Sequence, residues 1–597
     1  MENHMKYAAS LSLLIIFAIA FIFLRGPQDS LLENQGTSEI SAPNEFEHHA
    51  INELAEPQRN AVKDEAYTSA IGLAAPKPAS EKMLAEHFAG AQAAAAHAKQ
   101  IKESAMLVRQ RSHFIADTDS SMSIAPRDRE GYAAKTENRF LSVALSPLST
   151  FGLEVDSASY ANMRRQINNG QIPVPASVRL EELVNYFDYN FPAPTGKHPI
   201  AVMSDYAVAP WNPAHRIAMI GVKAVDTTAS SERGARITFL LDTSGSMNSP
   251  NKLPLLIRSF QTLLSNLKQD DQVAIVTYAG SAGVVLPPTP VTESNRIQRA
   301  LANLSAGGST AGGAGIALAY DVARKQFDSK ATNLVILATD GDFNVGASSD
   351  GELKAMIEKQ RASGVFLSVI GMGTGNYQDA KMQVLAEAGN GVAHYLDSDA
   401  EAQRLFGSEL SRTLHIAAKD VKVQVEFNPA AVAEYRLLGY ESRVMNAEDF
   451  RDDKKDSGEI GAGHSVVALY EIIPAGNGTA PDIERRYPTV RSAGSQAMEL
   501  GFVKIRYKQP DGDKGIEFAH AMTTQAKAIE SATADLRWAS AVAEFSLVLS
   551  QSEHAGSASY AAALRRARAV LPLMPDDKRS EFIGLIERLT TTRIAQE

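Results

Sequence analysis

The pattern of apolar and polar residues changes several times along the chain. Between residues 236 and 415, short apolar runs alternate with stretches whose apolar residues recur at helical spacing. The runs predict strands at residues 237–241, 273–278, 334–338 and 366–370, and the stretches predict helices at 252–267, 314–327, 353–362 and 400–414. Near-continuous apolar strands separated by helices require a mostly parallel sheet that is covered on both faces. The predicted fold class is therefore α/β, doubly wound and Rossmann-like.

The regions on either side of this segment have different patterns. Aromatic residues become frequent from residue 137 onward, and an amphipathic helix is predicted at 180–187. After Ala418, strict alternation at residues 421–427 and 503–507 predicts half-buried antiparallel strands. Helical patterns then follow at residues 535–549, 558–571 and 578–589. We therefore expect α+β modules on both sides of the α/β domain.

Residues 8–24 form an apolar run that is broken only by Ser10 and Ser12. The run is short for a transmembrane helix but longer than the apolar part of a typical signal peptide. We expect an uncleaved single-pass anchor; a removed signal peptide is the alternative, because residues 18–20 have the A-x-A form of a cleavage site. Lys6 and Arg25 flank the run symmetrically, so charge gives little indication of its orientation.

These changes in pattern divide the chain into five segments. Residues 1–25 hold the anchor, and residues 26–135 form a polar, Ala-rich linker that is partly helical. An extension follows at 136–235, then the α/β domain at 236–417, and a β-then-α region at 418–597.

Composition and motifs exclude several classes of function. The chain has no cysteine, which excludes disulfides, thiolate metal sites and thiol catalysis. Its net charge of -10 gives no basic footprint for nucleic acid. A phosphate-binding G-x-x-x-x-G-K-[ST] loop and the hydrolase motifs H-E-x-x-H and G-x-S-x-G are absent from the sequence. We therefore expect neither nucleotide binding nor enzymatic activity.

Oxygen-bearing side chains occur in three loops at the carboxyl ends of the predicted strands, where open parallel sheets place their ligand sites. The first strand ends in a D-x-S-x-S motif at Asp242, Ser244 and Ser246, Thr310 opens a helix, and Asp340 closes the strand at 334–338. Hydroxyls with few carboxylates suit Mg²⁺, or another divalent cation such as Mn²⁺ or Ca²⁺. Two neighbouring residues complicate the set: Ser309 is an alternative to Thr310, and Asp342 is interpreted as a solvated loop acid.

The combination of D-x-S-x-S, Thr310 and the T-D-G sequence at Asp340 resembles the metal-ion-dependent adhesion site (MIDAS) of von Willebrand factor type A (VWA) domains. The resemblance implies that Ser244, Ser246 and Thr310 lie close to the metal, while Asp242 and Asp340 act through water. It also implies an open metal position that a protein partner fills with an Asp or Glu.

The flanking regions also resemble known modules. The sequences at residues 151–162 and 434–441 look like the N-terminal extension and the C-terminal domain of unknown function of one bacterial group of VWA proteins. Residues 156–160 superficially repeat the metal motif, but Ala158 and Tyr160 stand where serines would be needed, so a structural role is expected.

These features together predict a membrane-anchored, divalent-cation-dependent adhesion or scaffold protein that is not an enzyme. We expect it in the bacterial inner membrane, with a single span and a periplasmic body. A cytoplasm-facing adaptor for an ATPase is the main alternative, and a metal-dependent hydrolase is a further one.

Overall fold

The structure of the chain is a computed structural model that describes residues 129–153, 156–226, 234–308, 312–341, 350–455, 457–476 and 499–596. These residues lie in the second of two compact units, residues 121–597. The expected anchor at residues 8–24 and most of the linker at 26–135 fall outside the described residues. In the part that is described, no helix combines the length and apolar content needed to cross a bilayer.

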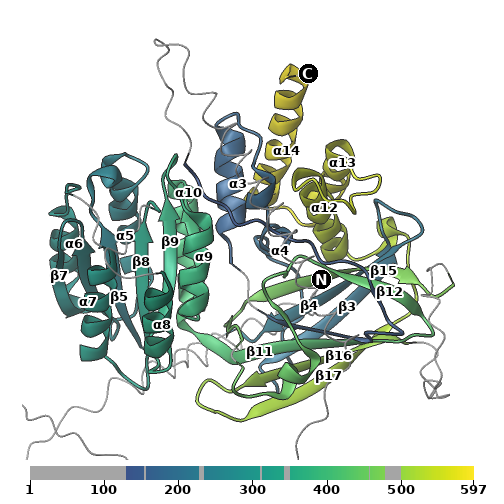
Figure 1. The fold of residues 1–597 in the computed structure, drawn as a ribbon, viewed down its shortest axis with the longest axis horizontal. Coiled ribbons are helices and arrows are strands. Elements are labelled where there is room, and N and C mark those ends of the chain that lie inside the picture. Colours follow the sequence, from purple (N-terminus) through teal and green to yellow (C-terminus); the bar gives the residue numbers. More distant parts are fainter. Residues whose placement is uncertain are drawn as a thin grey trace, which may run out of the picture. The chain divides into compact units, whose positions relative to one another are not determined.

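The α/β region contains a six-stranded sheet with the strand order β10-β9-β8-β5-β6-β7 (Figure 1). Its strands are β5 (Ala235–Asp242), β6 (Gln272–Tyr278), β7 (Ala282–Pro290), β8 (Thr332–Thr339), β9 (Phe366–Met372) and β10 (Ala393–Leu396). All neighbouring pairs are parallel except β6 and β7. The chain enters at the centre of the sheet and extends it first to one side and then to the other, which confirms the doubly wound α/β fold.

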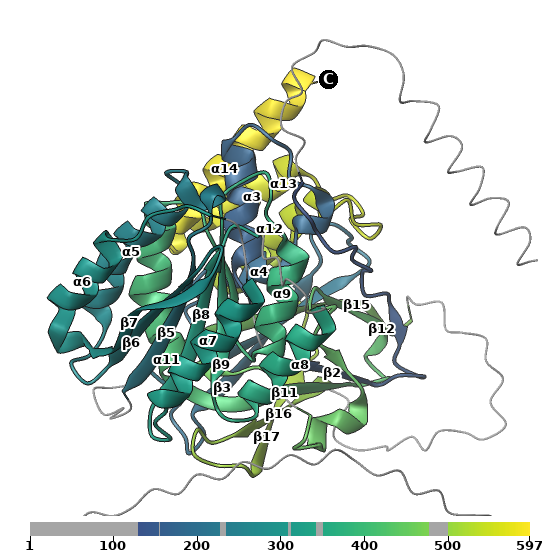
Figure 2. The same ribbon diagram turned by 60° about the vertical axis from the view of Figure 1, so that its left-hand side comes forward.

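Apolar cores cover both faces of this sheet. Along β5, Leu240 packs into one core, whereas Phe239 and Leu241 pack into the other. The first core is completed by helices α7 (Gly312–Lys325), α8 (Asp350–Arg361) and α9 (Asp379–Ala388) (Figure 2). The second is completed by α5 (Leu253–Asn266), α6 (Ser294–Ala302) and the helical segment 399–414, which begins with α10 (Asp399–Gln403) and ends with α11 (Leu410–Leu414). Burial on both faces explains why the central strands are continuous apolar runs in the sequence.

The extension and the C-terminal region contribute strands to the same two antiparallel sheets, ordered β1-β12-β15-β4-β3 and β13-β2-β11-β16-β17, with β14 paired to β11. From the extension come β1 (Leu141–Ser142), β2 (Leu148–Gly152), β3 (Ile200–Val208) and β4 (Arg216–Ala224). The other strands are β11 (Ile416–Phe427), β12 (Val432–Leu438), β13 (Val444–Met445), β14 (Ile460–Gly461), β15 (Ser465–Pro474), β16 (Glu499–Lys508) and β17 (Gly515–Thr523). Both sheets share one apolar core, which includes Phe151, Ile220 and Val423. Segments 136–235 and 418–597 therefore fold together.

A helical layer joins the same two segments. It contains α3 (Ala158–Asn168) and α4 (Leu180–Asn185) from the extension, with α12 (Ala534–Leu549), α13 (Tyr560–Val570) and α14 (Asp577–Gln596) from the end of the chain (Figure 1). Phe187, just after α4, packs edge-on against Trp538 and Phe582, with ring centroids 5.0 and 5.6 Å away. The three predicted C-terminal helices are confirmed, and so is the amphipathic helix near residue 180.

Residues 156–160 link the extension to the edge of the α/β sheet. The backbone N–H of Ala393 in β10 donates to the Asp156 carboxylate at 2.7 Å, and the Ser157 N–H donates to the Ala393 carbonyl at 3.2 Å. The two residues therefore satisfy backbone groups along the open edge of β10. The expected structural role of this sequence is confirmed.

Candidate metal centre

The D-x-S-x-S loop leaves the carboxyl end of β5 and turns at once into a short 3₁₀ helix, Gly245–Asn248. The Ser244 N–H donates to Asp242 Oδ1 at 2.8 Å, which folds the loop back over the carboxylate. As a result, the Ser244 and Ser246 hydroxyl oxygens lie 3.0 Å apart. Asp242 and Ser244 are buried while Ser246 is exposed, so the site opens to solvent at Ser246.

Two buried hydroxyl groups bind the second oxygen of the Asp242 carboxylate and fix its orientation. Tyr278 at the end of β6 and Thr339 at the end of β8 both donate to Asp242 Oδ2, at 3.1 and 3.2 Å. Burial raises the pKa of Asp242 above its ordinary value, and the nearby charge of Asp340 acts in the same direction. A carboxylate that is buried beside a second carboxylate is stabilised by any cation that binds between them.

Asp340 lies at the same edge of the sheet, directly after β8. Burial on its own would raise the pKa of Asp340, but hydrogen bonds from Lys252 and Ser246 outweigh burial and the net shift is downward. The bond from Lys252 joins Nζ to Asp340 Oδ2 at 2.7 Å. The structure thus brings Asp242, Ser244, Ser246 and Asp340 together through direct hydrogen bonds and a shared electrostatic environment.

The third predicted loop approaches the same point, although its key residue is not described. The Gly245 N–H donates to the Gly308 carbonyl at 3.1 Å, and the Gly307 N–H donates to the Thr243 carbonyl at 2.7 Å. These bonds join the loop before α7 to the D-x-S-x-S loop. Thr310 and its alternative Ser309 lie outside the described residues, as does Asp342, so the choice between the two hydroxyls stays a prediction.

The donor set at this edge fits a hard divalent cation. It consists of two adjacent hydroxyls and two carboxylates, all oxygen ligands of the kind Mg²⁺ prefers. Within the described ranges, no group of three or more His, Asp or Glu side chains is arranged to hold a metal. The candidate site is not a group of that kind, because it has only two carboxylates and its other predicted ligands are the hydroxyls of Ser244, Ser246 and Thr310.

The sequence analysis assigned no role in the site to three further residues: Lys252, Tyr278 and Thr339. Lys252 was assigned to the start of a helix and Tyr278 to the end of a strand. Each contacts an acid that is distant in sequence. Thr339, beside Asp340, could have been found, because the carboxyl end of β8 was already recognised as part of the site.

Gly341 allows the backbone to leave the site after Asp340. Its φ is +102°, and a Cβ at this position would lie 2.5 Å from the Gln378 backbone nitrogen. Gly375 also has a positive φ, +85°, but has open space at the Cβ position. We expect Gly341→Ala to lower the free energy of unfolding by at least about 1 kcal/mol more than Gly375→Ala, and to weaken Mg²⁺ binding roughly ten-fold. Urea unfolding measures the loss of stability, and calorimetric titration measures the loss of Mg²⁺ binding. Equal losses in the two variants would show that the close approach to Gln378 has no effect.

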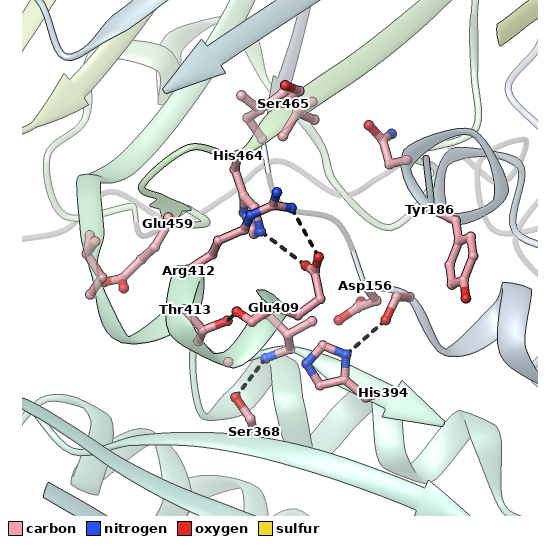
Figure 3. A pocket seen from close by; sticks show the side chains of 18 of the residues that line it. Asp156, Tyr186, Ser368, His394, Glu409, Arg412, Thr413, Glu459, His464 and Ser465 are labelled. Atoms are coloured by element: carbon pink, nitrogen blue, oxygen red, sulfur yellow. Dashed lines mark hydrogen bonds and ion pairs between the residues drawn. The ribbon is translucent and has the colours of Figure 1, made fainter. Parts of the chain in front are cut away.

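A second site of interest is a cavity of about 100 Å³ near the starts of β8 and β9, the sheet edge opposite Asp242 (Figure 3). Its polar side chains are paired with one another. Glu409 accepts hydrogen bonds from His464 at 3.2 Å and Arg412 at 3.1 Å, and Ser157 Oγ lies 2.8 Å from His394 Nδ1. The His464–Glu409 and Ser157–His394 pairs join the α/β region to the modules on either side of it.

His394 makes this junction sensitive to acid. Burial, together with the charge of Arg404, lowers the pKa of His394 from 6.5 to about 4, against the opposing charges of Glu409 and Glu401. Between those values the unfolded chain binds the proton and the folded chain does not, so stability is lost as the pH falls from 6.5 to 4. We expect His394→Asn to remove up to about 3 kcal/mol of this loss. Urea unfolding at pH 7 and pH 4.5 measures the difference, and identical pH dependence in both proteins would contradict the assignment.

Comparisons with known proteins agree with this architecture. Residues 237–408 match the von Willebrand factor type A domain family, residues 126–219 match a family described as von Willebrand factor, and residues 412–592 match the C-terminal family of uncharacterized protein YfbK. YfbK of Escherichia coli (strain K12) is 40% identical over 466 residues, which is 76% of this chain and 80% of that protein.

Two further similarities are weaker. Uncharacterized protein sll0103 of Synechocystis sp. is 26% identical over 33% of this chain and 45% of that protein. A solved structure of a von Willebrand factor type A protein from Catenulispora acidiphila has a TM-score of 0.39 at 17% identity, covering 67% of this chain and 91% of that one. The extent of the match to YfbK decides the assignment, and this chain belongs to the family of VWA-domain proteins that includes YfbK.

Proposed function

We propose that this chain is a membrane-anchored protein that binds another protein through a divalent cation held by Asp242, Ser244, Ser246, Thr310 and Asp340. The observation that carries the proposal is the meeting of the Ser244 and Ser246 hydroxyls, 3.0 Å apart, beside two aspartates at the carboxyl edge of the sheet. Ser246 is exposed, so a ligand from outside the chain can approach the site.

The chemistry of the site favours an acidic partner. A bound Mg²⁺ would supply an electrophilic position for an oxygen ligand from outside the chain. Asp242 and Asp340 both accept hydrogen bonds from neighbouring side chains, and these bonds fix the orientation of the two carboxylates. Carboxylates held in this way suit metal binding better than proton transfer in a reaction. Binding, rather than hydrolysis, is the function that this arrangement supports. VWA domains in general take part in metal-dependent protein interactions, and membership of the family supports the same conclusion.

The decisive test compares the capture of partners by three proteins, each in Mg²⁺ and in EDTA. The full-length chain, solubilised in detergent and immobilised, is exposed to envelope extract with Mg²⁺ or with EDTA. The same is done with Asp242→Ala and, as the matched control, with Asp321→Ala, an exposed acid on α7. We expect one set of proteins to be retained by wild type and Asp321→Ala in Mg²⁺ and lost in EDTA or in Asp242→Ala. Capture that persists in EDTA would rule out the cation-dependent mechanism, and Mg²⁺-dependent turnover by the purified protein would revive the hydrolase alternative.

We further propose that residues 8–24 hold the chain in the bacterial inner membrane with its body in the periplasm. The apolar run supports the anchor, and the side of the membrane is decided by experiment. A phosphatase that is active only in the periplasm, fused after Glu597, should be active in intact cells. An inactive fusion, together with an active cytoplasmic reporter at the same position, would instead support the ATPase adaptor.

A further inference from the structure

Lys252 is a buried cation inside the candidate metal site. It stands at the N-terminal boundary of α5, and its residue is 6% exposed. Its Nζ donates to Asp340 Oδ2 at 2.7 Å, and it also lies 3.4 Å from Asn376 Oδ1. Asp340 itself is fully buried, so the ion pair is shielded from solvent.

The packing around the Lys252 side chain confines it to this position. Gly373 has a φ of +80°, and a Cβ on it would lie 2.1 Å from Lys252 Cε. The aliphatic part of the lysine therefore occupies space that is available only because residue 373 is a glycine. A lysine confined in this way cannot swing out to solvent without giving up its contacts with both Gly373 and Asp340.

The charge of Lys252 changes the balance of the site. Counted as formal charges of the ionised side chains, Asp242 and Asp340 contribute two negative charges to the site and Lys252, which is paired with Asp340, contributes one positive charge. A divalent cation added to the two acids alone would give a neutral site. With Lys252 present, the same cation leaves the site with one net positive charge. A positive, partly desolvated site attracts an anionic ligand and holds the cation less tightly.

We propose that Lys252 is a positioning residue that sets the charge of the metal site, weakening the hold on the divalent cation and favouring an acidic group from the partner. This inference rests on the proposed function and deepens it. The cation and the partner's carboxylate then bind cooperatively, because the carboxylate supplies the negative charge that Lys252 has neutralised. The protein retains its cation best when it is engaged with an acidic partner.

The test is calorimetric titration of the full-length protein with Mg²⁺ alone, in wild type and Lys252→Met. Methionine keeps most of the length of the side chain and removes the charge together with the hydrogen bonds that Nζ donates to Asp340 and Asn376. We expect Lys252→Met to bind Mg²⁺ roughly ten-fold or more tightly, because Asp340 is released from its internal cation. Lys325→Met, an exposed residue at the far end of α7, removes the same charge elsewhere and should bind like wild type.

The direction of the change distinguishes this role from a purely structural one. Damage to packing would weaken Mg²⁺ binding, whereas loss of the charge should strengthen it. Urea unfolding adds a second readout: Lys252→Met should lose stability in EDTA and recover more of it with Mg²⁺ than wild type does. Lys252→Gln, which keeps a polar end group, replaces the methionine variant if that protein fails to fold.

Acetate serves as the carboxylate probe for the cooperative part of the inference. It should tighten Mg²⁺ binding in wild type and do so less in Lys252→Met. Mg²⁺ affinity that is unchanged or weaker in the variant would overturn the inference while leaving the proposed function intact. Wild-type protein that binds no Mg²⁺ would overturn both.

Discussion

Asp242→Ala is expected to abolish Mg²⁺ binding, with a loss of affinity of about 100-fold or more. Asp242 is the buried acid around which the D-x-S-x-S loop folds, since it accepts the Ser244 N–H at 2.8 Å. Its loss removes one of the two negative charges at the site and also releases the loop that positions the two serine hydroxyls. Calorimetric titration of the purified protein with Mg²⁺ measures the effect directly.

Two matched variants separate the causes of that loss. Asp242→Asn keeps a hydrogen-bond acceptor for the Ser244 N–H but loses the charge, and it should retain the fold of the loop with an intermediate loss of affinity. Asp321→Ala removes an exposed acid from the same domain and should leave Mg²⁺ binding unchanged. Full Mg²⁺ affinity in Asp242→Ala would mean that the cation binds at another site.

Arg164→Met is expected to cause the largest loss of stability, about 3 to 5 kcal/mol in the free energy of unfolding. Arg164 in α3 is 4% exposed in its side chain and pairs with Asp397 and with Glu401, the latter at 2.9 Å. Its guanidinium also donates to the Tyr186 hydroxyl at 2.9 Å. Replacing it leaves the Asp397 carboxylate buried without its cation and removes one of the two cations, Arg164 and Arg404, that pair with buried Glu401, at the contact between the extension and the α/β domain.

Arg258→Met is the control for this prediction. Arg258 on α5 pairs with Asp399 at 3.3 Å, but their side chains are 55% and 70% exposed. An exposed pair of this kind contributes little, so the change should stay within about 0.5 kcal/mol. Urea unfolding curves of both variants make the comparison. Similar small losses in both would show that the Arg164 cluster is not what holds α3 against the domain.

The α/β domain was predictable because its strands are buried on both faces. β5, β6, β8 and β9 are continuous apolar runs, and each was located from the sequence to within a few residues. The edge strands were missed for physical reasons. β7 carries Pro287, Pro288 and Pro290, which an edge strand tolerates, and it is largely exposed. β10 has only four residues, too few to show a period.

The partnership between the extension and the C-terminal region could not be predicted from local patterns. β2 pairs with β11, so that Phe151 lies opposite Val423, although the whole α/β domain separates the two residues in the sequence. Alternation of apolar and polar residues shows that a strand has a buried face, but it does not indicate which other strand pairs with it. Two segments that differ in pattern were therefore assigned to separate domains, although they share both sheets and the helical layer.

The candidate metal site shows the same division between local and distant information. Asp242, Ser244, Ser246 and Asp340 were recognised because each follows or closes a predicted strand at a known edge of the sheet. Lys252 was not, because its contact with Asp340 spans 88 positions and depends on the glycine at 373. A lysine at the start of a helix carries no sign of a buried ion pair. Thr310 stays a prediction from the family resemblance.

A crystal structure of the Mn²⁺-loaded protein, with anomalous scattering used to locate the ion, tests the central claim most directly. We predict one strong peak at the carboxyl edge of the sheet, bonded to the Ser244 and Ser246 hydroxyls and to Thr310, with Lys252 still paired to Asp340. A peak that lies away from both serines, or a Thr310 side chain remote from Ser244, would contradict the account.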